Sequence, residues 1–565
     1  MPHVTGAQAL IRLLQASKVR YVFGNPGSTE LPFMDALSEQ DAIQYILALQ
    51  EIPAVAIADG YAQATRSPAV VNLHISCGLG NGMGMLYNAY RAGSPLVLMV
   101  GQQDRRLAFA EPVLWGDIVG VARPWTKWAA EIQRVQELPR AVYRALKAAL
   151  MPPTGPVLLS LPVDLQMEDM ALDLTPWHFP DTHLRPPLAE LRQAAEILAK
   201  ATNPGILAGS RVCEADAVQE LVDLAERLGA PVFQESLICH GRSSFPSNHP
   251  LAAGMLPRWA PDVEQRLTEF DVLLAAGLDL LQEYIYHEPH NPFPETARIV
   301  HVDVNPWELG KNYPPAAAVI GHLKPALAEL AALLEQLMSP EQQCAAASRS
   351  CARGQAHYAQ RESLRRQAEA QYHFRPMAPL CLMDSLARVL PENIAVVEEA
   401  STISHLYLER SGLLGNAEGY FGQRGWALGW GLNCAIGVKL AWPSRPVLAI
   451  LGDGATLYGC QGLWTAARYR IPITFVVCNN KEYRILKDCA KVMKLPASLR
   501  GRFEGMDLVD PEIDFVGLAR SFGVAAQRVT VPEELREAVR DSLTRTTPTL
   551  IEALVGRPER PSVEP

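Results

Sequence analysis

The chain has 565 residues, a formal net charge of −9 at pH 7 and 48% hydrophobic residues. At roughly 150 residues per domain, this length predicts three or four domains. The modest negative charge and the lack of a basic stripe exclude a nucleic-acid-binding protein. A membrane protein is excluded as well, because no apolar run reaches the ~20 residues that a membrane span requires.

The cysteines and the N-terminus indicate the cellular compartment. The ten cysteines are scattered without a CxxC pair, which favours buried free thiols over a disulfide framework or a zinc site. The N-terminal residues, already polar by Thr5, show no signal-peptide pattern. We therefore expect a cytoplasmic protein.

The first region, residues 1–180, alternates strand-like apolar runs with helical patterns. The runs lie at 21–23, 45–49, 70–74, 96–100 and 157–161. Alternation of this kind predicts a parallel sheet that is covered by helices on both faces. A linker rich in proline follows this region and includes Pro176, Pro180, Pro186 and Pro187.

Two further α/β regions follow the proline-rich linker. Residues 190–338 contain strand-like runs at 205–208, 231–233, 271–276 and 298–304. The polar segment 339–375 is rich in Ala, Gln and Arg and lacks glycine clusters, so it is predicted to be a helical linker. Residues 376–565 form the last region. We therefore predict an α/β protein with three doubly wound parallel-sheet domains.

Two polar residues of the last region directly follow strand-like apolar segments. Asp453 comes just after the segment 447–451, and Asn480 comes soon after the segment 473–478. In a parallel sheet, both residues would emerge at the carboxyl edge, where ligands bind. Together with a backbone carbonyl they form an incomplete oxygen shell, which suits Mg²⁺ because positions remain for water and cofactor phosphates. The alternative is two ordinary turns.

The glycines on either side of Asp453 complete a pattern. Gly452 and Gly454 let the backbone turn tightly and let a diphosphate come close. With Asn480 and the asparagine before it, they resemble the GDG…NN signature of enzymes that use thiamin diphosphate. The resemblance implies that Asp453 and Asn480 bind Mg²⁺ through their side chains and that Glu482 contributes only its backbone carbonyl.

A thiamin enzyme also needs a carboxylate that protonates the aminopyrimidine ring of the cofactor. Glu51 fits this role, because it follows the strand-like run 45–50 and precedes the helix-like segment 53–63. A partly apolar site would raise its pKa toward the working range. The alternative is a solvated glutamate in the first turn of a helix, where the helix dipole favours it.

Other stretches resemble the benzoylformate decarboxylases within this family. They lie at 22–28, 47–51, 72–74, 101–103, 245–250 and 463–467. The resemblance implies a pyrimidine-binding, a central and a diphosphate-binding domain, in that order. It also implies a homotetramer with two active sites per dimer. The wider family includes acetolactate synthase, pyruvate and indolepyruvate decarboxylases and benzaldehyde lyase.

The same resemblance assigns further residues to the active site. His74, at the end of a strand-like run, would move protons on the substrate; the alternative is a structural histidine. Ser28, after a glycine-containing turn, would donate a hydrogen bond to the substrate; the alternative is an N-cap of the following helix. A second histidine is expected from the central domain, with His287 as the candidate and His290 as its competitor.

Three residues of the last region are assigned to the cofactor itself. By resemblance, Leu428 is the bulky apolar residue beneath the cofactor that holds it in its bent form; as a bare residue it would be core. Ser401 and Thr402 follow a strand-like run and would donate hydrogen bonds to the diphosphate. The alternative is that they cap the next helix.

Some positions depart from the decarboxylase pattern and leave the substrate open. The stretch 422–426 replaces a more apolar approach to Leu428, and Cys489 stands where an aryl pocket would need bulk. Lys481, Arg484 and Lys487 form a basic group that either meets an anionic substrate or is a solvated face, and we expect the solvated face.

Together, these features predict a thiamin diphosphate- and Mg²⁺-dependent decarboxylase. It would convert a 2-oxo acid, benzoylformate-like, to an aldehyde, with carboligation to 2-hydroxy ketones as a further activity. An acetolactate-synthase-like or benzaldehyde-lyase-like enzyme is the alternative, disfavoured in the first case because no flavin signature is visible in the central region. A cofactor-binding protein without catalysis is disfavoured by the presence of Glu51, Asp453 and Asn480.

Overall fold

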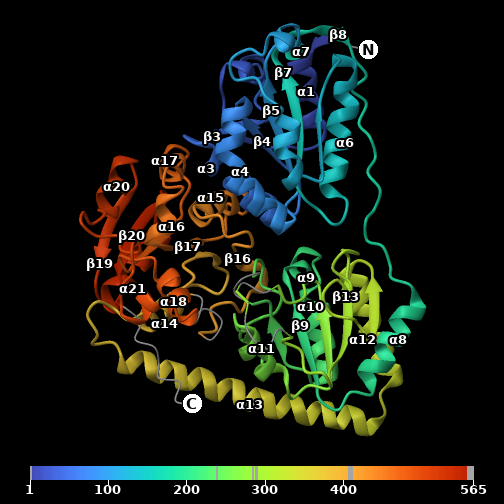
Figure 1. Ribbon diagram of the computed structural model, residues 1–565, viewed down its shortest axis with the longest axis vertical. Coiled ribbons are helices and arrows are strands. Elements are labelled where there is room, and N and C mark those ends of the chain that lie inside the picture. Colours follow the sequence, from blue (N-terminus) through green and yellow to red (C-terminus); the bar gives the residue numbers. More distant parts are fainter. Residues whose placement is uncertain are drawn as a thin grey trace.

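The computed structural model describes residues 3–236, 240–282, 285–286, 291–404, 407 and 411–556. Three α/β units, each with a six-stranded parallel sheet, make up the molecule (Figure 1). This arrangement confirms the predicted fold class. Within the described residues, no helix is both long enough and apolar enough to cross a membrane.

The N-terminal domain is built on six parallel strands. These are β2 (Tyr21–Asn25), β3 (Gln44–Leu47), β4 (Ala69–Leu73), β5 (Leu96–Gln102), β6 (Trp128–Glu131) and β7 (Val157–Pro162). They lie in the order β3-β2-β4-β5-β7-β6. The inner strands β4, β5 and β7 are buried along their whole length, as expected when helices cover both faces of a sheet.

Helices on both faces of this sheet form two separate apolar cores. The helices are α1 (Gly6–Ala16), α2 (Leu31–Ser38), α3 (Glu51–Thr65), α4 (Ile75–Ala92), α5 (Ile118–Ala122), α6 (Leu138–Leu150) and α7 (Val163–Met167). Helices α3 and α4 pack on one face, and α1 and α6 pack on the other. A short antiparallel pair, β1 (His3–Thr5) and β8 (Asp169–Ala171), ties the two ends of the domain together.

The central domain repeats this architecture. Its strands are β9 (Pro204–Ala208), β10 (Val232–Gln234), β11 (Ala252–Met255), β12 (Val272–Ala276), β13 (Arg298–Asp303) and β14 (Ala317–Ile320), in the order β11-β10-β9-β12-β13-β14. Its helices are α8 (Leu188–Ala199), α9 (Ser210–Glu214), α10 (Val218–Leu228), α11 (Ala260–Leu267) and α12 (Leu323–Leu337). Helices α8, α10 and α12 cover one face, and α11 covers the other.

A single long helix, α13 (Pro340–Ala370), connects the central and C-terminal domains and runs beneath both in Figure 1. Its start is fixed by a capping box, in which Ser339 and Gln342 each accept a hydrogen bond from the other's backbone amide. The helix buries Ala346, Gly354 and Ala368. It is therefore a largely solvated connection that buries a few small residues and also bonds to the central domain through Arg349, Arg353 and His357.

The C-terminal domain contains the third parallel sheet. Its strands are β15 (Ala395–Glu399), β16 (Tyr420–Gly422), β17 (Val447–Gly452), β18 (Thr474–Asn479), β19 (Ala525–Val529) and β20 (Thr549–Leu554), in the order β16-β15-β17-β18-β20-β19. Its helices are α14 (Pro379–Ala387), α15 (Trp430–Ala441), α16 (Asp453–Leu457), α17 (Gly462–Arg468), α18 (Arg484–Val492), α19 (Pro496–Leu499), α20 (Phe515–Ser521) and α21 (Pro532–Thr544).

The N-terminal and C-terminal domains share one continuous apolar core, which includes residues of α3 and α15. These two helices approach closely through glycines. A Cβ added to Gly60 would lie 2.3 Å from the backbone oxygen of Cys434, and one added to Gly437 would lie 1.9 Å from that of Ile57. Because only glycine fits such a crossing, the relative placement of the two domains is specified by these positions.

One arginine of the central domain binds to both other domains. The Arg242 guanidinium is buried and donates hydrogen bonds to the backbone oxygens of Gln63 (2.8 Å), Glu418 (2.6 Å) and Tyr420 (3.0 Å). It also lies 3.9 Å from the centroid of the Phe421 ring. Arg242 is thus a joint at which the three domains meet.

Candidate active site

The carboxyl edge of the C-terminal sheet contains a cavity of about 270 Å³. The sheet order places β15 beside β17, and the connections leave these strands in opposite directions. Ligands bind at such a switch point in open α/β sheets. The cavity is lined by all the residues that the sequence assigned to the cofactor in this domain: Ser401, Thr402, Leu428, Gly452, Asp453, Gly454, Asn480 and Glu482.

Asp453 is a buried carboxylate without an ion pair among the described residues. Its oxygens accept hydrogen bonds from the backbone amides of Gly454 (2.7 Å), Asn480 (3.1 Å) and Lys481 (2.7 Å). Burial raises the pKa of Asp453 to about 6, although these three amides lower it. The turn after β18 therefore holds the carboxylate in place without neutralising it.

The oxygen donors around Asp453 fit Mg²⁺. In the described part of the chain, no group of three or more His, Cys, Asp or Glu side chains could hold a metal. The Glu482 carboxylate accepts a hydrogen bond from Lys487 at 2.5 Å, so it is engaged away from a metal. One carboxylate, one amide oxygen and a backbone oxygen remain, as expected for an ion that also binds phosphates and water.

Leu428 lies in the cavity wall, at the end of a loop with a strained backbone. Trp426 has a φ of 65° and Gly429 a φ of 94°, in the left-handed region that glycine tolerates and tryptophan does not favour. The Glu399 carboxylate then caps α15 by accepting hydrogen bonds from the amides of Gly429 (3.0 Å), Trp430 (3.1 Å) and Gly431 (2.8 Å). Burial raises the pKa of Glu399 to about 8.

The structure also places in the cavity wall residues that the sequence reasoning missed. These are His240, Glu399, Gln423, Tyr458 and Tyr483, together with Trp426. His240 is buried and its ring lies 4.9 Å from that of Tyr420. A histidine followed by glycine after the second strand of the central domain was the available signal, but it is a weak one. His287 and His290, the predicted histidines of the central domain, lie outside the described residues.

The basic group after Asn480 is ion-paired. Lys481 lies 2.5 Å from a Glu512 oxygen, Arg484 lies 3.0 Å from an Asp488 oxygen, and Lys487 is buried against Glu482. The prediction of a solvated face is wrong for Lys487, because two carboxylates draw its ammonium group inward. Arg484 also lines the cavity.

The remaining predicted residues lie at the carboxyl edge of the N-terminal sheet. Glu51 opens α3 and is only 8% exposed, which excludes the alternative of a solvated first-turn glutamate. Asn81 donates a hydrogen bond to the Glu51 carboxylate at 3.1 Å. A Cβ on Gly78 would lie 3.2 Å from the same carboxylate, so α4 packs closely beside it.

His74 and Ser28 lie on neighbouring strand ends at the switch point between β2 and β4. His74 Nδ1 lies 2.8 Å from the carboxylate of buried Glu30 and 3.2 Å from the Thr29 hydroxyl. Both contacts are made by Nδ1 and neither involves Nε2. Ser28 is exposed and begins a short 3-10 helix whose N-cap is Gly27, so the N-cap alternative is wrong. Glu30, two residues after Ser28, was missed.

Within one chain, the two groups of predicted residues stay apart. Ser28, Glu51 and His74 are not among the residues that line the cavity of Asp453 and Asn480. Helices α3 and α15 pack together within the chain instead. The single chain therefore places the predicted residues of the outer domains in two separate groups, one at the carboxyl edge of each outer sheet.

Comparisons with known proteins agree with this geometry. Three family models of thiamine pyrophosphate enzymes match the chain: the N-terminal TPP binding domain at residues 4–112, the central domain at 191–330 and the C-terminal TPP binding domain at 416–553. The chain belongs to the thiamin diphosphate-dependent enzyme family. This finding confirms the resemblance seen in the sequence.

Individual relatives show which members of this family the chain is similar to. Benzoylformate decarboxylase of Pseudomonas aeruginosa is 33% identical over 549 residues, which cover 96% of this chain and 97% of the relative. A probable acetolactate synthase large subunit of Methanocaldococcus jannaschii is 28% identical, with 99% and 93% covered. Among solved structures, a 4-hydroxybenzoylformate decarboxylase of Rhodococcus jostii has a TM-score of 0.83 at 29% identity, with 98% and 100% covered. Benzoylformate decarboxylase of Polynucleobacter necessarius has a TM-score of 0.86 at 27% identity, with 99% of each chain covered.

Proposed function

We propose that the protein is a thiamin diphosphate- and Mg²⁺-dependent decarboxylase that converts a 2-oxo acid to an aldehyde, with carboligation to 2-hydroxy ketones as a further activity. The observation that carries the proposal is the buried carboxylate of Asp453, which has no ion pair among the described residues and lies in a cavity that Asn480, Gly452 and Gly454 also line. The similarity to two benzoylformate decarboxylases supports an aryl 2-oxo acid as substrate.

In this proposal, the residues of the cavity bind the cofactor. Asp453, Asn480 and the backbone carbonyl of Glu482 hold Mg²⁺, while Ser401 and Thr402 donate hydrogen bonds to the diphosphate. Thiamin diphosphate, when bound, supplies a nucleophilic carbon and accepts the electrons left by carbon dioxide. The apolar Leu428 in the cavity wall would pack against the cofactor and keep water away from it.

The residues of the N-terminal edge move protons in the same proposal. Glu51 holds the proton that the aminopyrimidine ring needs. His74 is oriented by Glu30 so that its Nε2 exchanges a proton with the substrate, and Ser28 donates a hydrogen bond to the substrate carboxylate. His287 of the central domain is proposed as the second histidine.

We propose that a second copy of the chain completes each site, in a homotetramer with two active sites per dimer. The separation of Ser28, Glu51 and His74 from the cavity of Asp453 supports this assembly. Co-expression of a Glu51→Gln chain with an Asp453→Asn chain tests it. Mixed dimers should regain activity that neither variant has alone, because one of their two sites is then intact. No recovery in demonstrated mixed dimers would contradict a shared site.

The reaction is tested by carbon dioxide release from a panel of aryl and aliphatic 2-oxo acids, with thiamin diphosphate and Mg²⁺ present. We expect release that requires both cofactors and falls roughly 10²-fold or more in Glu51→Gln. Glu190→Gln, in the first turn of α8, is the control and should keep full activity. Silence across the panel with bound cofactor would favour a lyase or ligase that acts on aldehydes.

An acetolactate-synthase-like carboligase is the second candidate, because the relative from Methanocaldococcus jannaschii covers nearly the whole chain. Product analysis with pyruvate separates the two functions: a decarboxylase releases acetaldehyde, whereas a carboligase yields acetolactate. A cytoplasmic location belongs to the same proposal and agrees with the nine described cysteines, all of which are free.

A further inference from the structure

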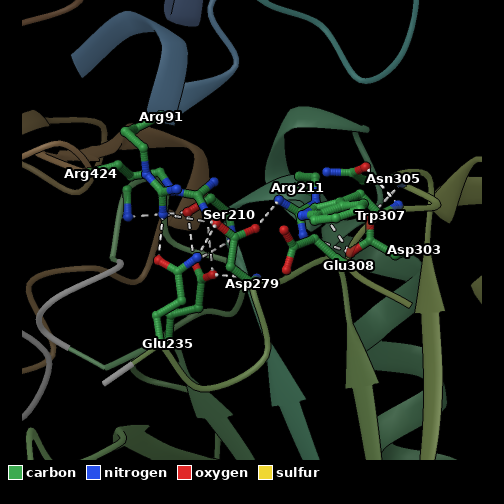
Figure 2. A network of polar contacts seen from close by, with 12 residues as sticks. Arg91, Ser210, Arg211, Glu235, Asp279, Asp303, Asn305, Trp307, Glu308 and Arg424 are labelled. Atoms are coloured by element: carbon green, nitrogen blue, oxygen red, sulfur yellow. Dashed lines mark hydrogen bonds and ion pairs between the residues drawn. The ribbon is translucent and has the colours of Figure 1, made fainter. Parts of the chain in front are cut away.

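The switch point of the central sheet carries a cluster of buried charges. Strands β9, β10 and β12 end there, and their following residues include Arg211, Glu235 and Asp279 (Figure 2). Ser210 donates two hydrogen bonds, from its amide (3.0 Å) and hydroxyl (2.9 Å), to the Glu235 carboxylate. Arg211 lies 2.7 Å from Asp279 and 2.8 Å from Asp303. At this edge, protein side chains occupy the position where α/β sheets often bind ligands.

Arg424 enters this cluster from the C-terminal domain, beyond the end of β16. Its side chain is only 3% exposed, and its Nη2 lies 3.3 Å from an Asp279 oxygen and 3.5 Å from a Glu235 oxygen. Figure 2 shows it beside Arg91, which reaches Asp279 from the N-terminal domain at 3.2 Å. We call Arg91, Arg211, Glu235, Asp279, Asp303 and Arg424 the central ionic cluster.

The ion contacts of Arg424 are long. Within the described residues, neither its Nε nor its Nη2 has a hydrogen-bond partner. A buried arginine with such contacts contributes little net stability, because its desolvation offsets the attraction. Burial raises the pKa of Glu235, whereas Asp279, although buried, keeps a pKa well below its usual range because of Arg424, Arg211 and Arg91. Asp279 is thus the ionised partner of Arg424.

The loop that follows Arg424 forms part of the cofactor cavity. Gln423, Trp426 and Leu428 line the cavity on both sides of the strained Trp426 backbone. Asn88 of α4 brackets the far end of the loop: it donates a hydrogen bond to the Ala427 carbonyl (2.8 Å) and accepts one from the Ala427 amide (3.0 Å). A strained residue persists only where its surroundings over-determine it, and at this end of the loop the buried Asn88 of the N-terminal domain supplies that restraint.

The near end of the loop also packs closely against the central domain. A Cβ on Gly241 would lie 2.7 Å from Cγ and Cδ of Arg424, so the arginine stem fills the space above this glycine. The Gly422 amide donates a hydrogen bond to the Gly241 carbonyl at 2.7 Å. The contact is therefore specific in shape as well as in charge.

We propose that Arg424 is a positioning residue for the proposed reaction: through Glu235 and Asp279 it holds the loop 423–428 so that Gln423, Trp426 and Leu428 form the cavity wall. The expected effect on catalysis rests on the proposed function, whereas the placement of the loop does not. Arg424 itself does not touch the reacting atoms. It fixes the cavity wall relative to the central domain.

The test removes the tether without unbalancing the buried charge. In Arg424→Met combined with Asp279→Asn, one positive group and the ionised carboxylate that faces it are lost together. Hydrogen–deuterium exchange of residues 423–428 in the cofactor-free protein should become at least tenfold faster, and kcat of the loaded enzyme should fall at least tenfold. The matched control is Arg365→Met combined with Glu362→Gln, an exposed pair on α13, which should change neither quantity.

A second variant keeps the test decisive if the double variant does not fold. Arg424→Lys retains the charge but not the reach of the guanidinium group, so exchange of the loop and kcat should lie between those of the wild type and the double variant. Wild-type exchange and wild-type kcat in the folded variants would overturn the inference. If the wild type releases no carbon dioxide and yet the loop exchange rises, the proposed function fails while the role of Arg424 in placing the loop stands.

Discussion

Two sheets of this protein use the same topological position in opposite ways. At the switch point of the C-terminal sheet, Asp453 is buried with three backbone amides and no ion pair among the described residues. At that of the central sheet, Asp279 faces three arginines. Both edges border a cavity, of about 270 Å³ and 330 Å³ respectively. A buried carboxylate without a cationic partner, such as Asp453, is a candidate for binding a ligand, whereas one surrounded by arginines, such as Asp279, holds segments of the protein together.

The largest expected effect comes from the unpaired carboxylate. Asp453→Asn should lower decarboxylation roughly 10³-fold because the metal clamp on the diphosphate is lost. The melting temperature of the cofactor-free protein should stay the same or rise, because at pH 7 a buried carboxylate with a pKa of about 6 costs folding free energy when it ionises. Calorimetric titration with Mg²⁺ and thiamin diphosphate checks the loss of binding; retained tight binding would contradict it.

The paired carboxylate should show the reverse pattern. Asp279→Asn should destabilise the protein by about 3 kcal/mol, because buried Arg424 and the partly buried Arg91 and Arg211 lose an ionised partner. Urea unfolding, with the first transition as the measure, tests this effect. Asp541→Asn removes a surface partner of Arg545 and serves as the control. A loss no larger than that of the control would show that the cluster is dispensable.

The helix cap beside the cavity predicts a smaller, pH-dependent effect. Glu399 has a pKa of about 8 when folded, against 4.5 for an ordinary glutamate, so the folded protein binds the extra proton between these values. Stability relative to Glu399→Gln should therefore fall as the pH rises from about 4.5 to about 8, and then level off. Melting temperatures of both proteins across this range should diverge by a few degrees. Parallel curves would mean that Glu399 stays ionised throughout.

An exposed ion pair gives the smallest effect and sets the baseline. Arg185 lies 2.6 Å from a Glu329 oxygen, a shorter contact than any that Arg424 makes. Because solvent screens exposed charges, Arg185→Gln should cost less than about 1 kcal/mol in urea unfolding. A larger cost would mean that separation, rather than burial, decides what such pairs contribute.

Much of the fold was readable from the sequence because the inner strands are uninterrupted apolar runs. The predicted run 157–161 matches β7, for example, and the runs before Asp453 and Asn480 match β17 and β18. Edge strands carry no such signal. Strand β6 is half-buried throughout, and β19 is mostly exposed, so neither produces the apolar run by which a strand is recognised.

The site was readable where a residue opens the helix that comes soon after a strand. Asp453 and Glu51 were found in this way, and the structure buries both. What could not be predicted depends on packing between distant segments. Arg424 lies next to the predicted Leu428, yet its role depends on Glu235 and Asp279, far away in the sequence. The burial of Lys487 likewise depends on Asp507, twenty residues further on.

The Arg242 joint has a consequence for the order of folding. Its guanidinium group finds its acceptors only when the central domain has met both Gln63 of the N-terminal domain and Glu418 and Tyr420 of the C-terminal domain. If only two domains were docked, the Arg242 guanidinium group would be partly buried with some of its hydrogen-bond acceptors absent. Docking of the third domain is then a late and cooperative step. In Arg242→Leu, the lifetime of the partly assembled species during refolding should therefore differ from that in the wild type. Identical refolding kinetics would argue against a late docking step that depends on Arg242.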